Sequence, residues 1–122
     1  MKKYILMNAN NIEASYIVKG RIEEIRNDLK DRFLNTFGEP VADNDPRVED
    51  DFHFISESRF NSVDTMTFEE LKEEFEAEYG WVLVELDNKE ELVSKVLDED
   101  NRVNREDIEE QIQYLIEEEI TN

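Results

Sequence analysis

A chain of 122 residues with 39% apolar side chains is long enough for one compact domain with a modest core. Its 33 Asp and Glu against 14 Lys and Arg give a formal net charge of −19, which argues against direct binding to nucleic acid or to an anionic membrane. The lack of Cys excludes disulfides, thiolate zinc sites and cysteine nucleophiles in this chain, and imidazole chemistry is left to His53 alone.

The first predicted elements are two strands joined by a tight turn. Residues 3–7 and 12–19 are rich in β-forming side chains, and the Asn-rich residues 8–11 between them are typical of a hairpin connection. In the second strand apolar residues alternate with mixed ones, so one face is expected to be apolar. That face would carry Ile12, Ala14, Tyr16 and Val18.

A helix is predicted over residues 21–37, because apolar residues recur there every three or four positions until Gly38 supplies a stop signal. Residues 39–51 contain both prolines and six acidic residues, which predicts a solvated loop. Residues 52–55 are then expected to form a short strand, and residues 56–65 an irregular segment.

The clearest helix start lies at residues 67–70, where Thr67 and Glu70 form a capping box. An apolar stripe follows as far as Gly80, which ends the helix. Residues 81–86 predict a strand apolar enough to be central in the sheet.

Two further helices are predicted near the C-terminus from their caps. Asn88 with Glu91 opens a short helix, and Asn104 with Asp107 opens the last one. We therefore predict a single acidic α+β domain over residues 1–122. Its N-terminal β-hairpin would extend to a small, mainly antiparallel sheet of three or four strands, with about four helices packed mainly on one face.

The acidity is uneven along the chain. Residues 1–38 carry seven Lys and Arg and five Asp and Glu, a net charge of +2, whereas residues 39–122 carry seven and 28, a net charge of −21. Within the predicted helix before Gly80, six glutamates give about one carboxylate per 3.3 Å of axis, close to the roughly 3.4 Å per phosphate of a DNA strand. Lys72 is the only counter-charge in that helix.

The candidate partner-binding residues are two groups of glutamates placed against local preference. Like charges three or four residues apart destabilise a helix, and the helix dipole opposes carboxylates at a C-terminal end. We predict that both groups contact a partner. They are Glu69, Glu70, Glu73, Glu74, Glu76 and Glu78, and then Glu117, Glu118 and Glu119.

Catalytic and cofactor chemistry finds no support in the motifs. The frame that starts at Asp98 resembles a calcium-binding loop but has Val103 in place of the required Gly, and the three glycines form no phosphate-binding loop. His53 is expected to be structural or on the surface, and no serine nucleophile motif accompanies it. We expect no enzymatic activity, no cofactor and no metal site. Phe60 and Tyr114 fall outside the apolar stripes and would anchor a protein interface if they were exposed beside the acidic helices.

These observations favour a protein-binding inhibitor whose carboxylates imitate nucleic-acid phosphates and block the basic groove of a DNA- or RNA-handling protein. In charge and size alone the chain is similar to small anti-restriction and anti-CRISPR proteins of phages and mobile elements. The alternative is a non-enzymatic regulatory or adaptor domain that acts through an apolar groove or a homodimer interface, with acidity serving solubility. An ordinary solvated surface and a salt-adapted origin also remain open.

The expected location is the cytoplasm. The charged start of the chain reaches Asn8 before an apolar segment as long as that of a signal peptide has formed. No stretch approaches the roughly 18 apolar residues of a membrane span.

Overall fold

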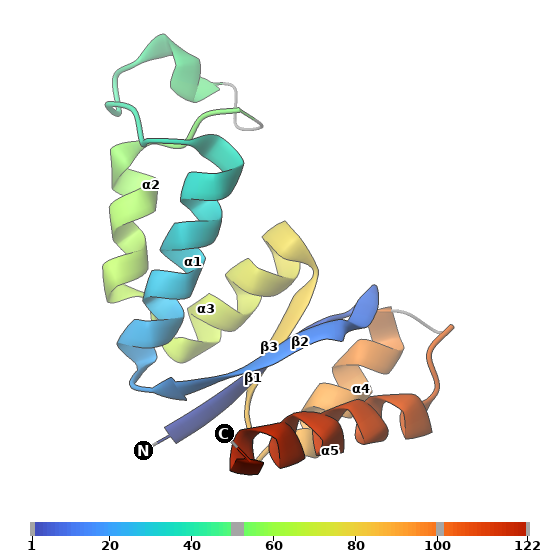
Figure 1. Cartoon of the computed structure of the whole chain (residues 1–122). Coiled ribbons are helices and arrows are strands. Elements are labelled where there is room, and N and C mark those ends of the chain that lie inside the picture. The colour runs from blue at the N-terminus through green and yellow to red at the C-terminus, as the bar shows by residue number, and fades with distance from the viewer. Residues whose placement is uncertain (1, 50–52, 100–101, 122) are drawn as a thin grey trace. The chain divides into compact units, whose positions relative to one another are not determined.

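The computed structural model describes residues 2–49, 53–99 and 102–121, with the side chains of residues 49 and 119–121 outside that description (Figure 1). The described elements confirm the α+β class: one antiparallel sheet of three strands and five α-helices, one helix more than predicted. In chain order they are β1 (Lys2–Asn8), β2 (Asn11–Gly20), α1 (Ile22–Phe37), the 3-10 turn η1 (Pro46–Glu49), α2 (Glu57–Ser62), the 3-10 turn η2 (Val63–Thr65), α3 (Phe68–Glu74), the π-helical turn η3 (Phe75–Tyr79), β3 (Trp81–Glu85), α4 (Lys89–Glu99) and α5 (Arg105–Thr121).

The chain divides into two compact units, and each is described by itself. The sheet unit comprises Met1–Gly20 and Lys72–Asn122, and the helical unit comprises Arg21–Leu71. The sheet unit carries eight Lys and Arg against 19 Asp and Glu, and the helical unit carries six against 14. The net charges are therefore −11 and −8, so each unit is acidic.

The sheet has the strand order β2-β1-β3, with β1 antiparallel to both neighbours. Four consecutive residues of β1, from Tyr4 to Met7, are buried, and since successive side chains point to opposite faces, both faces of this strand are covered. The prediction that residues 81–86 are the central strand is wrong, because β3 lies at an edge. Its apolar character has another cause, namely helix packing over Val82 and Val84.

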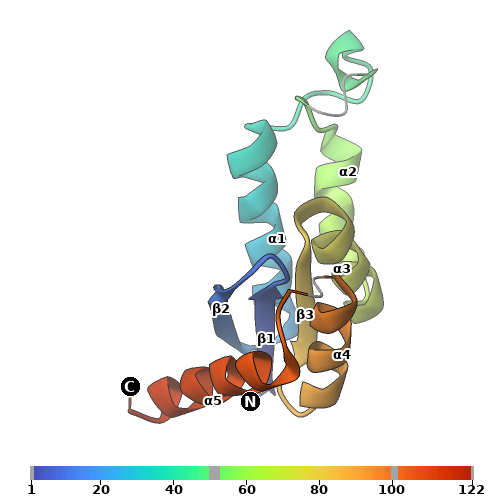
Figure 2. The same ribbon diagram turned by 90° about the vertical axis from the view of Figure 1, so that its right-hand side faces the viewer.

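The core of the sheet unit lies between one face of the sheet and helices α4 and α5 (Figure 2). Alternate residues of β1 and β3 face these helices, and each helix contributes three buried side chains at helical spacing. The buried members are Ile5, Met7, Val82, Val84, Leu92, Val93, Val96, Ile108, Ile112 and Leu115.

A bulge interrupts the hairpin near its turn. Residues 11–16 of β2 lie opposite residues 6–8 of β1, so β2 has more residues than its partner over this stretch. The predicted alternation is therefore wrong at Ala14, which is exposed, and at Ser15, which is buried, since a shift of register moves side chains to the other face. The Ser15 hydroxyl donates to the Ile12 carbonyl at 2.5 Å, which satisfies the buried polar group.

In the helical unit, the predicted helix over residues 21–37 is confirmed as α1, with Ile25, Leu29 and Phe33 on its buried face. It ends at Gly38, whose φ of +76° is a conformation that other residues rarely adopt. The Gly38 N–H donates to the Leu34 carbonyl at 2.9 Å.

The segment after the acidic loop differs from its prediction. Residues 53–55 do not form a strand, and Phe52 lies outside the described residues. A single parallel bridge joins Val41 to Ser56 instead. The predicted irregular segment 56–65 is also wrong, because α2 and η2 occupy residues 57–65. The Ser56 hydroxyl caps α2 by accepting a hydrogen bond from the Arg59 N–H at 3.2 Å. The sequence did not predict this helix, because no apolar stripe follows Ser56.

Two of the three predicted helix caps are confirmed by hydrogen bonds. The Thr67 hydroxyl accepts from the Glu70 N–H at 3.2 Å while the Glu70 carboxylate accepts from the Thr67 N–H at 3.1 Å. The Asn104 side-chain oxygen accepts from the Asp107 N–H at 2.9 Å. Asn88 directly precedes α4, but its hydrogen bonds run through its backbone, and Glu91 pairs with a lysine.

Gly80 ends the segment that contains α3 and η3, as predicted, in a left-handed conformation with φ +69°. The π-helical turn before it was not predicted. No helix within the described ranges is long and apolar enough to cross a bilayer.

Candidate functional site

The predicted glutamates before Gly80 differ in exposure. Glu73 and Glu78 of the sheet unit are exposed, whereas Glu74 and Glu76 are half-buried. Glu69 and Glu70 belong to the helical unit and are exposed on the first turn of α3. The carboxylates available to a partner in this segment are therefore fewer than the sequence pattern implied.

Glu70 has a local structural role in addition to its exposure. Hydrogen bonds from the backbone and the hydroxyl group of Thr67 lower the pKa of Glu70. The negative charge of Glu70 therefore stabilises the beginning of α3, where the helix dipole also favours it.

Lys72 is largely buried and forms an ion pair with a residue of another helix. Its side chain is 10% exposed, and its ammonium group lies 2.5 Å from the carboxylate of Glu91 on α4. Lys95 lies 3.8 Å from the same carboxylate. The one basic residue within residues 68–79 is thus largely buried and paired with a carboxylate of α4.

Glu76 takes part in contacts within the sheet unit. Its carboxylate lies 3.7 Å from the Lys95 ammonium group. A side-chain hydrogen bond with Glu76 raises the pKa of Glu99, and desolvation and the negative charges of Glu76 and Asp98 act in the same direction. Glu76 therefore links η3 to α4 and is only partly available to a partner.

The second predicted group lies at the end of α5. Glu117 and Glu118 are exposed, and Glu117 accepts a hydrogen bond from the Gln113 amide at 3.3 Å. The side chain of Glu119 lies outside the described residues. The last turn of α5 contains no basic residue, so the dipole leaves these carboxylates unfavourably placed, as expected.

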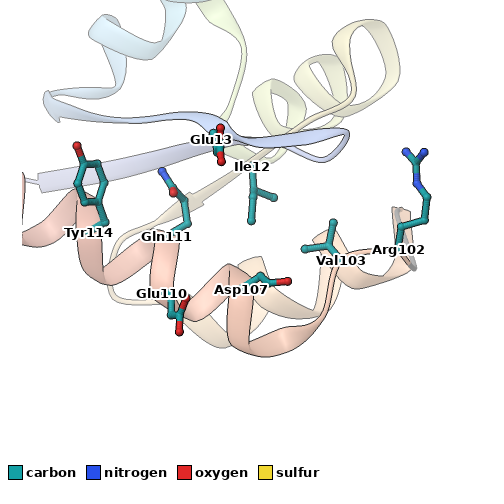
Figure 3. Close-up of a pocket in the computed structure, with 8 residues that line it drawn as sticks. All are labelled: Ile12, Glu13, Arg102, Val103, Asp107, Glu110, Gln111 and Tyr114. Carbon is teal, nitrogen blue, oxygen red and sulfur yellow. The ribbon is translucent and has the colours of Figure 1, made fainter.

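A groove of about 520 Å³ lies between the bulged part of β2 and α5 (Figure 3). Ile12 points from β2 toward α5, while Gln111 and Tyr114 extend from α5 toward the strand. The sequence pattern did not reveal this groove, because its two walls are about a hundred residues apart in the chain. Its lining residues are Ile12, Glu13, Arg102, Val103, Asp107, Glu110, Gln111 and Tyr114.

The two aromatic residues singled out in the sequence differ in environment. Tyr114 is 58% exposed and belongs to the groove, beside the carboxylates of α5. Phe60 is half-buried in the helical unit, and the Lys30 ammonium group lies 5.1 Å from its ring centroid. Only Tyr114 meets the condition for an interface anchor.

The described residues include no group of three or more His, Asp or Glu side chains arranged to hold a metal ion. His53 is exposed in a turn of the helical unit. No family model, no curated protein and no solved structure matches this chain.

Proposed function

We propose that this protein is an acidic inhibitor that binds a basic nucleic-acid-handling protein by imitating nucleic-acid phosphates. The observation that supports this most is the burial of Lys72. The cation closest in sequence to the exposed Glu73 and Glu78 is largely buried, and its ammonium group pairs with Glu91 on α4. A solvated helix face that served only solubility would gain from an exposed lysine there.

The inhibitor would act by competition for a basic groove. A net charge of −19 attracts a cationic partner over a long range and speeds encounter. Carboxylates then take the place of phosphates on the partner's Lys and Arg side chains and release bound counterions, so affinity falls as salt rises. A host defence protein that cuts or binds foreign DNA in the cytoplasm is the partner class that this mechanism suits.

The test uses the protein as bait in a lysate of its own host, with elution by a salt gradient and identification by mass spectrometry. The proposal expects a basic nucleic-acid-binding protein that elutes at raised salt. The purified partner should then lose its DNA or RNA when the acidic protein is added. A partner that binds equally well at every salt concentration, or that keeps its nucleic acid, would overturn the proposal.

A matched pair of variants tests which carboxylates matter. Glu73→Gln with Glu78→Gln removes two exposed charges from the sheet unit and should weaken the complex by about tenfold, with a shallower salt dependence. Glu24→Gln with Glu106→Gln removes two exposed charges elsewhere and should weaken it by about twofold or less. Equal losses of affinity in the two double variants would mean that the net charge, and not the position of the carboxylates, determines binding.

A second candidate function is a small regulatory or adaptor domain that binds through the groove or forms a homodimer. The groove and the exposed Tyr114 favour it. Under this function Tyr114→Ser would abolish partner binding or dimer formation, while the Glu73→Gln and Glu78→Gln variant would retain it. Sedimentation at several protein concentrations measures the dimer directly.

A further inference from the structure

The groove between β2 and α5 is built from side chains of one helix face and one strand bulge. Asp107, Gln111 and Tyr114 are separated by four and three residues, so they lie along one face of α5, and Glu110 lies at the edge of that face (Figure 3). Ile12 and Val103 supply an apolar part and also contact the core of the sheet unit. The apolar part of the groove is therefore held by the packed core of the sheet unit.

The bulge determines what β2 presents to this groove. Bulges occur next to functional sites, where they change the direction of a side chain. Here the extra residues of β2 lie between Asn11 and Tyr16, and Ile12 and Glu13 among them line the groove. A regular hairpin would place alternate side chains of residues 12–15 on opposite faces, with no irregular wall facing α5.

The charges of the groove indicate a cationic occupant. Three carboxylates, of Glu13, Asp107 and Glu110, are opposed by the single guanidinium group of Arg102. Arg105, which is close in sequence, forms ion pairs with Glu90 and Glu109, neither of which lines the groove. Its charge is thus committed elsewhere, and the groove remains acidic.

Because the ring of Tyr114 is exposed in this groove, an arginine side chain fits it better than a lysine side chain. A guanidinium group is planar, stacks on an aromatic face and binds a carboxylate with two parallel hydrogen bonds, whereas an ammonium group is a strongly hydrated point charge. We propose that this groove binds an arginine side chain carried by an extended basic segment of the partner protein. The apolar surface of Ile12 and Val103 would contact the methylene part of that side chain.

This inference rests on the proposed function in one respect, namely that the partner is a basic protein. It assigns a contact separate from the glutamates before Gly80. A second copy of this chain is a poor occupant, because it would bring further carboxylates against Glu13, Asp107 and Glu110.

The test titrates the full chain with two capped peptides that contain three arginines or three lysines separated by glycines. Backbone amide signals in two-dimensional NMR locate the binding. We expect the arginine peptide to shift the signals of Glu13, Gln111 and Tyr114, and to bind about threefold or more tightly than the lysine peptide. Shifts spread over all acidic segments, or equal affinities for the two peptides, would overturn the inference.

Four variants separate the groove from general electrostatics. Tyr114→Leu should reduce the affinity for the arginine peptide by about fivefold, within the range expected for loss of a cation–π contact. Glu110→Gln should reduce it by about threefold, and its control Glu106→Gln, on the same helix but outside the groove, by less than about 1.5-fold. Arg102→Gln should increase it, because a like charge is removed. Circular dichroism confirms that each variant is folded.

Comparison with the Glu73→Gln and Glu78→Gln variant distinguishes this inference from the proposed function. That variant should bind the arginine peptide normally at the groove even though its complex with the natural partner is weakened. If Tyr114→Leu and Glu110→Gln leave the peptide affinity unchanged, the groove inference fails while the proposed function stands. If natural-partner binding is insensitive to salt but the groove variants lose peptide binding, the proposed function fails instead.

Discussion

Lys72 is a basic residue of an acidic segment whose side chain is buried in an ion pair. Lysine is among the residues least often buried, yet this side chain is 10% exposed and extends to Glu91 on α4. The spacing of apolar residues in the sequence gave no reason to place it inside, because its buried position depends on a carboxylate 19 residues away. Ion pairs between separate elements are formed by tertiary structure and leave no local signal.

Replacing Lys72 by Met should destabilise the protein by about 1–2 kcal/mol. Breaking a fully buried pair costs about 3–5 kcal/mol, and the cost here is smaller because Glu91 is 33% exposed and keeps Lys95 nearby. Urea unfolding measures the change. The control Lys89→Met removes an exposed lysine and should change stability by less than about 0.5 kcal/mol. A loss as small as that of the control would show that the Lys72 pair contributes little.

Glu99→Gln should stabilise the protein at pH 7, and the gain should shrink as the pH falls toward 4. The pKa of Glu99 is raised in the folded state by its contacts with Glu76, so its stabilising contribution is present below the unfolded pKa and is lost as the pH rises through the folded value. At pH 7 the ionised Glu99 repels its neighbours, and Gln removes that repulsion. Urea midpoints at both pH values test this, and a gain that is the same at both would contradict it.

At the scale of elements, local signals were sufficient where the chain carries caps or stop residues. The hairpin, α1 and the starts of α3 and α5 follow from Asn-rich turns, glycines and capping residues that act within a few positions. The strand order was not predictable in this way, because pairing of β1 with β3 joins residues far apart in the chain. α2 was missed because its six residues include no buried apolar side chain.

The bulge and the groove mark the limit of sequence analysis for the site. The alternation of residues 12–19 predicted a regular strand. The bulge was missed because nothing in the composition of residues 11–16 distinguishes a bulged strand from a regular one. Tyr114 stood out because it lies outside the apolar stripe of its helix, and it is indeed exposed. Its neighbours across the groove depended on the packing of α5 against β2.

Asn104→Ala should destabilise the protein by about 1 kcal/mol, the usual cost of losing a side-chain helix cap. The loss is expected in global unfolding because α5 contributes Ile108, Ile112 and Leu115 to the core. Asn88→Ala is the matched control at the start of α4, where the hydrogen bonds of Asn88 run through its backbone, and should cost less. If the two variants lose equal stability, the cap on α5 is not the cause.

At the scale of the whole molecule, the dominant property is the repulsion among its negative charges. Both units are acidic, with net charges of −11 and −8, so the excess of negative charge is not confined to one of them. Such a charge keeps a protein dispersed and attracts cationic partners, and it also opposes folding into a small volume. The free protein and its complex should therefore respond to salt in opposite directions.

Raising NaCl from about 0.05 to 0.5 M shortens the Debye length from about 14 to about 4 Å and should stabilise the free protein by about 1 kcal/mol. The melting temperature should rise by roughly 4 °C. A variant that combines Glu24→Gln, Glu73→Gln, Glu78→Gln and Glu106→Gln carries less negative charge, so its stability should rise less with salt. The complex with a basic partner should weaken over the same range. A free protein whose stability falls with salt would contradict this account.

The irregular start of β2 has a further consequence for how the protein behaves when concentrated. A long, flat strand at the margin of a sheet is a template for adding strands from other molecules, which leads to fibrils. Here one margin is bulged and carries Glu13 and Lys19, and the other is a strand of only five residues, Trp81–Glu85. Shortening residues 12–15 into a regular hairpin would remove this protection and make the chain prone to aggregate during expression and storage.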